Sequence, residues 1–246
     1  MAISEPEGHS AWRKQRPSGR GSLQKRLCHA RMMQTEDESV NQVNYQRELD
    51  KIIEGLTGAG EDSAPDLFLH SCCAPCSSYV LEYLCRYFHI TVFYYNPNIS
   101  ASEEYRKRVA EQKRLIEAYN REEKGYPIKI IEGDYEPERF YEIAKGFEAC
   151  PEGGERCFRC FDLRLRETAK RAKEGGYAYF CTTLTISPLK NAVKLNEIGQ
   201  ALSEEYGVSW LPSDFKKRNG YKRSIELSAE YELYRQNYCG CAFSRR

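Results

Sequence analysis

Apolar residues follow two different spacings along this chain. From Val40 to Leu56 they recur three or four positions apart, which predicts an amphipathic helix that ends at a cluster of glycines. After Pro65 short apolar runs alternate with longer amphipathic segments. We therefore expect a helical lead-in at residues 34–64, which packs on the edge of a catalytic α/β domain at residues 65–246.

Strands and helices are predicted in turn within this domain. The predicted strands are the runs of apolar and β-branched residues at 67–69, 90–95, 128–131 and 177–181. The predicted helices cover residues 77–87, 102–119, 137–145, 163–173, 189–206 and 225–235. Such alternation is typical of a parallel sheet with helices on both faces.

Polar residues and cysteines follow the predicted strands. Cys72 and Cys73 come after the first strand, 96–98 after the second, Asp134 after the third and Thr182 after the fourth. Because parallel strands present their carboxyl ends at one edge of the sheet, ligands bind there. We expect these residues to converge on one rim that carries the chemistry.

Charge is distributed unevenly, although the formal net charge is only +1. Residues 1–33 contain seven of the 37 basic residues and two of the 36 acidic ones, in a polar mixture without periodicity. We expect a disordered basic extension here, with a nucleic-acid-binding arm as the alternative, and initiation at Met32 or Met33 would remove it. The other 30 basic and 34 acidic residues leave a net charge of −4, so a polyanion would bind to a local patch.

The chain has 11 cysteines, and most of them fall in three groups: Cys72-Cys73-Ala74-Pro75-Cys76, Cys157-Phe158-Arg159-Cys160 and Cys239-Gly240-Cys241. Such groups indicate either disulfides or a metal or redox centre. No segment has the apolar stretch of a signal peptide or of a membrane span, so we expect a cytoplasmic protein with reduced thiols. This compartment favours the metal or redox interpretation.

Four thiolates are enough to hold a zinc ion or an iron–sulfur cluster. Cys72, Cys73, Cys157 and Cys160 form the predicted quartet, because each is expected in a loop that the topology brings to the rim. A vicinal pair fits a cluster, whose ligands bind different irons, better than it fits one zinc ion. Cys76 is either a further ligand or a first-turn helix residue that faces the site.

The remaining cysteines receive different interpretations. Cys239 and Cys241 either bind a second metal or cycle between dithiol and disulfide, in a segment that the flanking aromatic residues predict to be docked. Cys85 lies on the apolar side of a predicted helix and is interpreted as a core thiol. We assign no role to Cys150 or Cys181.

Eight motifs follow one another between about Asn44 and Ser244. They are His70-x-Cys72-Cys73-Ala74-Pro75-Cys76, Phe93-Tyr94-Tyr95-Asn96-Pro97-Asn98-Ile99, Glu104-Tyr105-x-x-Arg108, Gly133-Asp134-Tyr135, Arg156-Cys157-x-x-Cys160-Phe161, Thr183-Leu184-x-x-Ser187-Pro188-x-Lys190, Asp214-Phe215-Lys216-Lys217 and Tyr234-Arg235-Gln236-Asn237-Tyr238-Cys239-Gly240-Cys241. In this combination the chain resembles the QueH family, the cobalamin-independent epoxyqueuosine reductases.

The resemblance implies a Rossmann-like fold of the adenine-nucleotide-hydrolase type. It implies reduction of epoxyqueuosine to queuosine at the wobble position of tRNA, the last step of queuosine biosynthesis, with an electron donor as a further partner. The family's 4Fe–4S ligands fall on Cys72, Cys73, Cys157 and Cys160, and its redox-active pair falls on Cys239 and Cys241. A second iron is also implied, with Cys76 as a candidate contributor.

Two further sets of residues are candidates for this reaction. Asp134 and Asp214, both expected at the rim, are candidate proton donors, and solvated salt bridges are the alternative. Five basic residues interleaved with Phe215 and Tyr221 offer the cations and stacking faces that an RNA loop requires, and a solvated charge run is the alternative. These tRNA-binding candidates are Lys216, Lys217, Arg218, Lys222 and Arg223.

Two other functions use the same features. A zinc-stabilised RNA-binding module without catalysis would need the same cysteines. A tRNA-modifying ATPase is disfavoured, because the first strand leads into cysteines and the chain has no Gly-x-x-x-x-Gly-Lys phosphate loop.

Overall fold

The computed structural model describes residues 43–57 and 64–244. The predicted disordered extension at 1–33 lies outside these residues, and of the lead-in the structure describes helix α2 (Tyr45–Thr57). Leu49 and Ile53 of α2 are buried in the main core, as the helical spacing predicts. Among the described helices, none has the length and apolar composition that crossing a membrane requires.

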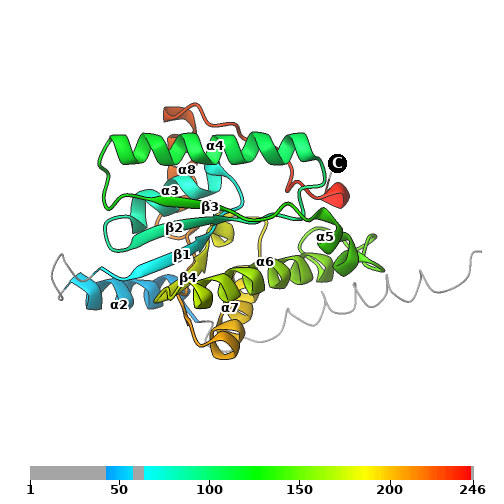
Figure 1. Ribbon diagram of the computed structural model, residues 1–246, viewed down its shortest axis with the longest axis horizontal. Coiled ribbons are helices and arrows are strands. Elements are labelled where there is room, and N and C mark those ends of the chain that lie inside the picture. Colours follow the sequence, from blue (N-terminus) through cyan, green and yellow to red (C-terminus); the bar gives the residue numbers. More distant parts are fainter. Residues whose placement is uncertain (1–42, 58–63, 245–246) are drawn as a thin grey trace, which may run out of the picture.

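A five-stranded sheet forms the centre of the domain, and all its strand pairs are parallel (Figure 1). The strand order is β3-β2-β1-β4-β5. The strands are β1 (Asp66–His70), β2 (His89–Tyr94), β3 (Lys129–Glu132), β4 (Tyr179–Thr182) and β5 (Ser209–Trp210). The predicted parallel sheet is confirmed, together with its first four strands.

Helices cover both faces of this sheet, as Figure 1 shows. They are α3 (Ala74–Leu84), α4 (Ser102–Arg121), α5 (Pro137–Ala144), α6 (Glu155–Glu174), α7 (Ala192–Tyr206) and α8 (Gly220–Glu230), with short 3-10 turns η2 (Thr183–Ile186) and η3 (Ala242–Ser244). Alternate residues of a strand point to opposite faces. Leu67 and Leu69 therefore join the core under α3 and α4, whereas Phe68 joins the core under α6 and α7.

The order of the strands creates a switch point between β1 and β4. After β1 the chain adds β2 and β3 on one side, and it then adds β4 and β5 on the other. In open parallel sheets the loops diverge at such a point and leave a crevice at the carboxyl ends of the strands. The segments at residues 71–73 and 183–190 border this crevice.

Three sequence predictions are wrong in their boundaries. Helix α6 begins at Glu155 and not at residue 163, so Cys157 and Cys160 lie on the first turns of a helix and not in a loop. Helix α8 covers residues 220–230 and not 225–235, because a Cβ on Gly220 would lie 2.1 Å from the Phe215 carbonyl oxygen and only glycine fits there. Strand β5 was not predicted, since two residues have no readable period.

Asn196 of α7 ties the β5 region to the rest of the domain. Its side chain is 2% exposed. Its Nδ2 donates to the carbonyl oxygens of Ala192 and Ser213, and its Oδ1 accepts from Trp210 Nε1 and from the Ser213 amide, at 2.8–3.0 Å. One side chain therefore satisfies four buried polar groups, which are costly when they are left unpaired.

Replacing this residue should destabilise the domain. We expect Asn196→Ala to lower the free energy of unfolding by about 2–3 kcal/mol, because buried donors and acceptors lose their partners. Chemical denaturation followed by circular dichroism measures the change. Gln200→Ala, at an exposed position of the same helix, is the control and should change the value by less than about 0.5 kcal/mol. Equal effects of the two substitutions would contradict this role.

Candidate functional site

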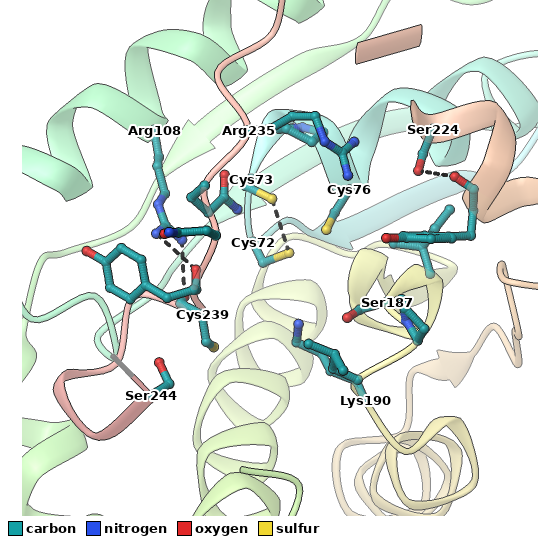
Figure 2. A pocket seen from close by; sticks show the side chains of 18 of the residues that line it. Cys72, Cys73, Cys76, Arg108, Ser187, Lys190, Ser224, Arg235, Cys239 and Ser244 are labelled. Atoms are coloured by element: carbon teal, nitrogen blue, oxygen red, sulfur yellow. Dashed lines mark hydrogen bonds between the residues drawn. The ribbon is translucent and has the colours of Figure 1, made fainter. Parts of the chain in front are cut away.

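A cavity of about 660 Å³ opens at the carboxyl ends of the strands, beside the switch point (Figure 2). Its wall is built from four parts of the chain: the segment after β1, helices α4 and α6, the segment after β4, and the C-terminal segment with α8. The polar and sulfur-containing residues of this wall include Cys72, Cys73, Cys76, Arg108, Arg164, Lys190, Arg235, Gln236 and Cys239. The predicted convergence on one rim is thus confirmed for the loops after β1 and β4.

Three thiols lie close together at the N-terminus of α3. The sulfur atoms of Cys72, Cys73 and Cys76 are all within 4.8 Å of one another, and those of Cys72 and Cys73 are 3.8 Å apart. Figure 2 shows these side chains side by side. Cys76 belongs to the first turn of α3 and faces the other two thiols, as the second interpretation of this residue predicts. This group of thiols can hold a metal ion.

The three thiols differ strongly in their pKa values. Hydrogen bonds from Cys73 and Cys76 hold the pKa of Cys72 well below its ordinary value. The same hydrogen bonds to Cys72 raise the pKa of Cys73 to about 12 and that of Cys76 well above the ordinary value. Among the three residues, Cys72 is therefore the one that loses its proton most readily. A bound metal replaces such shared protons, because thiolates are the ligands.

Buried hydrogen bonds fix the loop that carries Cys72 and Cys73. Gln112 Oε1, from α4, accepts from the hydroxyls of Ser71 and Ser77 at 2.8 and 2.9 Å. Asn96 Nδ2 donates to the Ser71 carbonyl oxygen at 2.8 Å. The segment after β2 and helix α4 therefore hold this loop in position. The sequence did not reveal this role of Gln112, because the residue lies within an ordinary amphipathic helix.

His70 has a structural position at the end of β1. Its side chain is fully buried, Nδ1 accepts from the Thr182 hydroxyl at 2.9 Å, and Nε2 donates to the Tyr95 carbonyl oxygen at 3.1 Å. Burial, with the nearby charge of Arg164, lowers the pKa of His70 to about 3, so the imidazole is neutral. It joins the ends of three adjacent strands.

The C-terminal segment is docked against α4 and the loop before it. Arg108 Nη1 and Nη2 donate to the carbonyl oxygens of Cys239 and Tyr238 at 3.1 and 3.4 Å, while Nε pairs with Glu104 at 2.7 Å. Gly240 has a φ of 104°, and a Cβ there would lie 2.9 Å from Ile99. Glycine is thus required between the two cysteines. The predicted docking of this segment is confirmed.

The other cysteines of the predicted site lie in different surroundings. Cys241 is buried with Cys160, Phe140 and Ala144, while Cys239 lines the cavity. Among the described residues, the one set of three thiols within 4.8 Å is Cys72, Cys73 and Cys76, so Cys157 and Cys160 lie outside that tight group.

Four cations line the cavity, and from the sequence only Arg235 was expected to act, as a cation that favours the thiolates of Cys239 and Cys241. Arg108 and Arg164 are 2% and 1% exposed, and Lys190 and Arg235 belong to the same wall. Burial lowers the pKa of Lys190, but the thiols of Cys239, Cys72 and Cys76 raise it by more, so this lysine remains charged. The cavity therefore suits an anionic occupant. Three of these residues lie in the quoted motifs, but Arg164 lies outside all of them.

Comparison with known proteins identifies the family of this chain. A sequence profile of the family described as Epoxyqueuosine reductase QueH matches residues 67–246. The chain therefore belongs to the QueH family. A relative of that name from Staphylococcus epidermidis is 46% identical over 204 residues, which cover 82% of this chain and 84% of that protein. Relatives from Streptococcus pyogenes and Thermotoga maritima are 41% and 36% identical, over 83% and 72% of this chain and 79% and 89% of those proteins.

The two aspartates predicted for this QueH site lie outside the main cavity wall. Asp134 is largely exposed and lies 3.9 Å from Arg171. Asp214 pairs with Lys216 at 2.8 Å and lines a neighbouring cavity of about 410 Å³, which also includes Lys190. Both aspartates therefore have the salt-bridge contacts of the alternative interpretation.

Most of the predicted basic run is paired within the fold. Arg218 pairs with Asp50 and Arg223 pairs with Glu82, in addition to the pair between Lys216 and Asp214. Lys217 is exposed, and the side chain of Lys222 is 76% exposed, with its Nζ 3.9 Å from a Glu226 carboxylate oxygen.

The aromatic residues of the same run differ from each other. Phe215 is fully buried, so the expectation that it offers a stacking face is wrong. Tyr221 is 38% exposed and lines the cavity. The surface available to a partner is therefore smaller than the sequence suggested.

Removing one thiol of the tight group should reduce bound metal. We expect Cys72→Ala, Cys73→Ala and Cys76→Ala each to lower the iron or zinc content of the anaerobically purified protein, because an ion loses one of its ligands. Elemental analysis per chain gives the measurement. Cys85→Ala removes a core thiol outside the cavity and is the matched control. Metal contents equal to the control in all three variants would rule out this group as a metal site.

Proposed function

We propose that this protein reduces epoxyqueuosine to queuosine at the wobble position of tRNA. The observation that carries the proposal is the cavity at the switch point, which gathers thiols and cations from distant segments in a chain of the QueH family. Its volume of about 660 Å³ lies within the range of small-molecule sites. The strand order supports a Rossmann-like fold of the adenine-nucleotide-hydrolase type.

The thiols suit a 4Fe–4S cluster and a second iron. Soft thiolate ligands select iron–sulfur clusters, zinc and copper(I). We assign the cluster to Cys72, Cys73, Cys157 and Cys160, since cluster ligands bind different irons and need not lie as close together as the ligands of one ion. The short distances from Cys76 to Cys72 and Cys73 make Cys76 a candidate ligand of the second iron. Such a centre would supply electrons and a Lewis acid for the epoxide oxygen.

The reaction needs two electrons and two protons for each epoxide. The two C–O bonds break, a C=C double bond forms, and the oxygen leaves as water. Oxidation of two thiols to one disulfide releases two electrons and two protons, which balances this reaction. Cys239 lines the cavity and Cys241 follows one residue later, so we assign the dithiol to this pair, with a separate electron donor needed to reduce it again.

The tRNA contributes an anticodon loop to this cavity. Enzymes that modify a base take it out of the stack and bind it in a pocket. Lys190 and Arg235 line the cavity, and exposed Lys217 and Lys222 lie in the same region of sequence as the half-exposed Tyr221. We place the phosphate contacts at Lys217 and Lys222, with Lys216, Arg218 and Arg223 held in ion pairs beside them.

Asp134 and Asp214 remain candidate proton donors that the reaction does not require. The dithiol already releases two protons, and both carboxylates are engaged in salt bridges. A zinc-stabilised RNA-binding module remains the alternative function. It would be colourless, would bind tRNA and would leave epoxyqueuosine unchanged.

The dithiol assignment predicts the effect of single serine substitutions. Cys239→Ser and Cys241→Ser should each reduce turnover to background while tRNA affinity and iron content stay near the unmodified level, because a lone thiol cannot form the disulfide. Nucleoside analysis of digested tRNA gives the ratio of queuosine to epoxyqueuosine. Cys85→Ser is the control for loss of a thiol elsewhere. Near-normal turnover in either variant would return the pair to a structural role.

The tRNA contacts predict a change in salt dependence. Lys217→Ala combined with Lys222→Ala should weaken tRNA binding and reduce the slope of log Kd against log salt by about one to two, since fewer counterions are released. Binding titrations over a range of salt concentrations provide the test. Lys170→Ala with Lys173→Ala, on the exposed far part of α6, is the matched control. The same slope in both double variants would place the RNA surface elsewhere.

A further inference from the structure

Arg164 of α6 is a buried cation whose guanidinium is only partly satisfied. The residue is 1% exposed. Its Nε donates to the Cys160 carbonyl oxygen at 3.1 Å, and its Nη1 donates to Asn96 Oδ1 at 3.4 Å. Its Nη2 is buried and has no hydrogen-bond partner. A buried donor of this kind indicates that a partner belongs beside it.

The charge of Arg164 is not neutralised by the part of the chain that the structure describes. Its two hydrogen-bond acceptors are a carbonyl and an amide, and no carboxylate pairs with it among residues 43–57 and 64–244. Arg108, the other buried arginine of this wall, instead pairs with Glu104 at 2.7 Å. A charge that is left buried and unpaired is strongly destabilising. The anion for Arg164 is therefore expected inside the cavity.

Cysteines share the cavity wall with this guanidinium. Arg164 lines the cavity together with Cys72 and Cys239, and it lies one helical turn after Cys160. The position of Arg164 under the surface also separates it from the exposed lysines that suit RNA phosphates.

We propose that Arg164 is the electrostatic partner of the anionic sulfur–metal centre in this cavity. The Nη2 group donates a hydrogen bond to a sulfur atom of that centre, and the charge stabilises the centre and raises its reduction potential. Hydrogen bonds to sulfur and local charge are established controls of iron–sulfur potentials. This inference rests on the proposed function, and it makes Arg164 a positioning residue that contacts the cofactor.

Two substitutions separate the charge from the geometry. Arg164→Gln removes the charge, whereas Arg164→Lys keeps the charge and loses the planar fork. Anaerobic redox titration without tRNA should give a more negative midpoint potential for Arg164→Gln and a smaller shift for Arg164→Lys. Iron and sulfide content per chain should fall in the same order. Arg166→Gln, at a half-exposed position two residues later in α6, is the control and should leave both values unchanged.

The possible outcomes separate the role of Arg164 from the proposed reductase function. If Arg164→Gln retains its iron with the potential of the unmodified protein, the inference is overturned while the proposed reductase function stands. A change that appears only after tRNA is added overturns it too, because the anion is then an RNA phosphate. An unmodified protein without iron overturns both. If Arg164→Gln does not fold, as judged by circular dichroism, the potential of Arg164→Lys decides: a value equal to that of Arg166→Gln rejects the contact.

Discussion

The placement of buried cations beside the thiols of the cavity is the constraint on which this site depends. A guanidinium group that is buried without an anion is costly, and thiolates that bound a metal would repel one another without nearby cations. Each set of charges makes the other tolerable. Glu104 neutralises the charge of Arg108. The remaining N–H groups of Arg108 donate hydrogen bonds to the C-terminal segment and thereby hold Cys239 in place. Arg164 has no such partner in the described fold and is free to act on the contents of the cavity.

The fold brings these charges together through a small number of buried polar contacts. Gln112 and Asn96 hold the loop after β1, His70 joins the ends of the central strands, and Arg108 fastens the end of the chain to α4. None of these side chains needs to take part in the chemistry. They position thiols from two distant segments around one crevice, and this explains why a site of this kind requires the whole domain.

Much of the fold follows from the sequence because its signals are local. The alternation of short apolar runs with amphipathic segments predicts the parallel sheet, and the residues after each strand predict the rim. The predicted limits of helices and strands were wrong where the pattern of apolar residues was weak. Strand β5 has two residues, and the start of α6 is rich in charged residues that conceal its buried stripe. Helix α8 begins at Gly220, five residues before the predicted start, at a position beside Phe215 where only glycine fits.

The site was predictable in its cysteines and not in its cations. Thiols occur in recognisable groups, whereas Arg164 is one of many basic residues on a charged helix. The parts of the chain that enclose Arg164 are the segment after β2 and the other segments of the cavity wall. They are distant from Arg164 in sequence. The five residues of the basic run show the opposite error, since ion pairs with Asp50, Glu82, Asp214 and Glu226 engage four of them. Asp50 and Glu82 come from other elements of the fold, so the local sequence does not reveal these partners.

The central claim is that the cavity holds a redox-active iron–sulfur centre that reduces the epoxide on tRNA. The most direct test is to purify the protein anaerobically, record its visible absorption spectrum, and then follow the spectrum and the nucleosides together after adding tRNA that contains epoxyqueuosine and a chemical reductant. The account predicts a coloured protein with bound iron and sulfide, whose spectrum changes as queuosine forms. A colourless zinc protein that binds the tRNA and leaves epoxyqueuosine intact would contradict it.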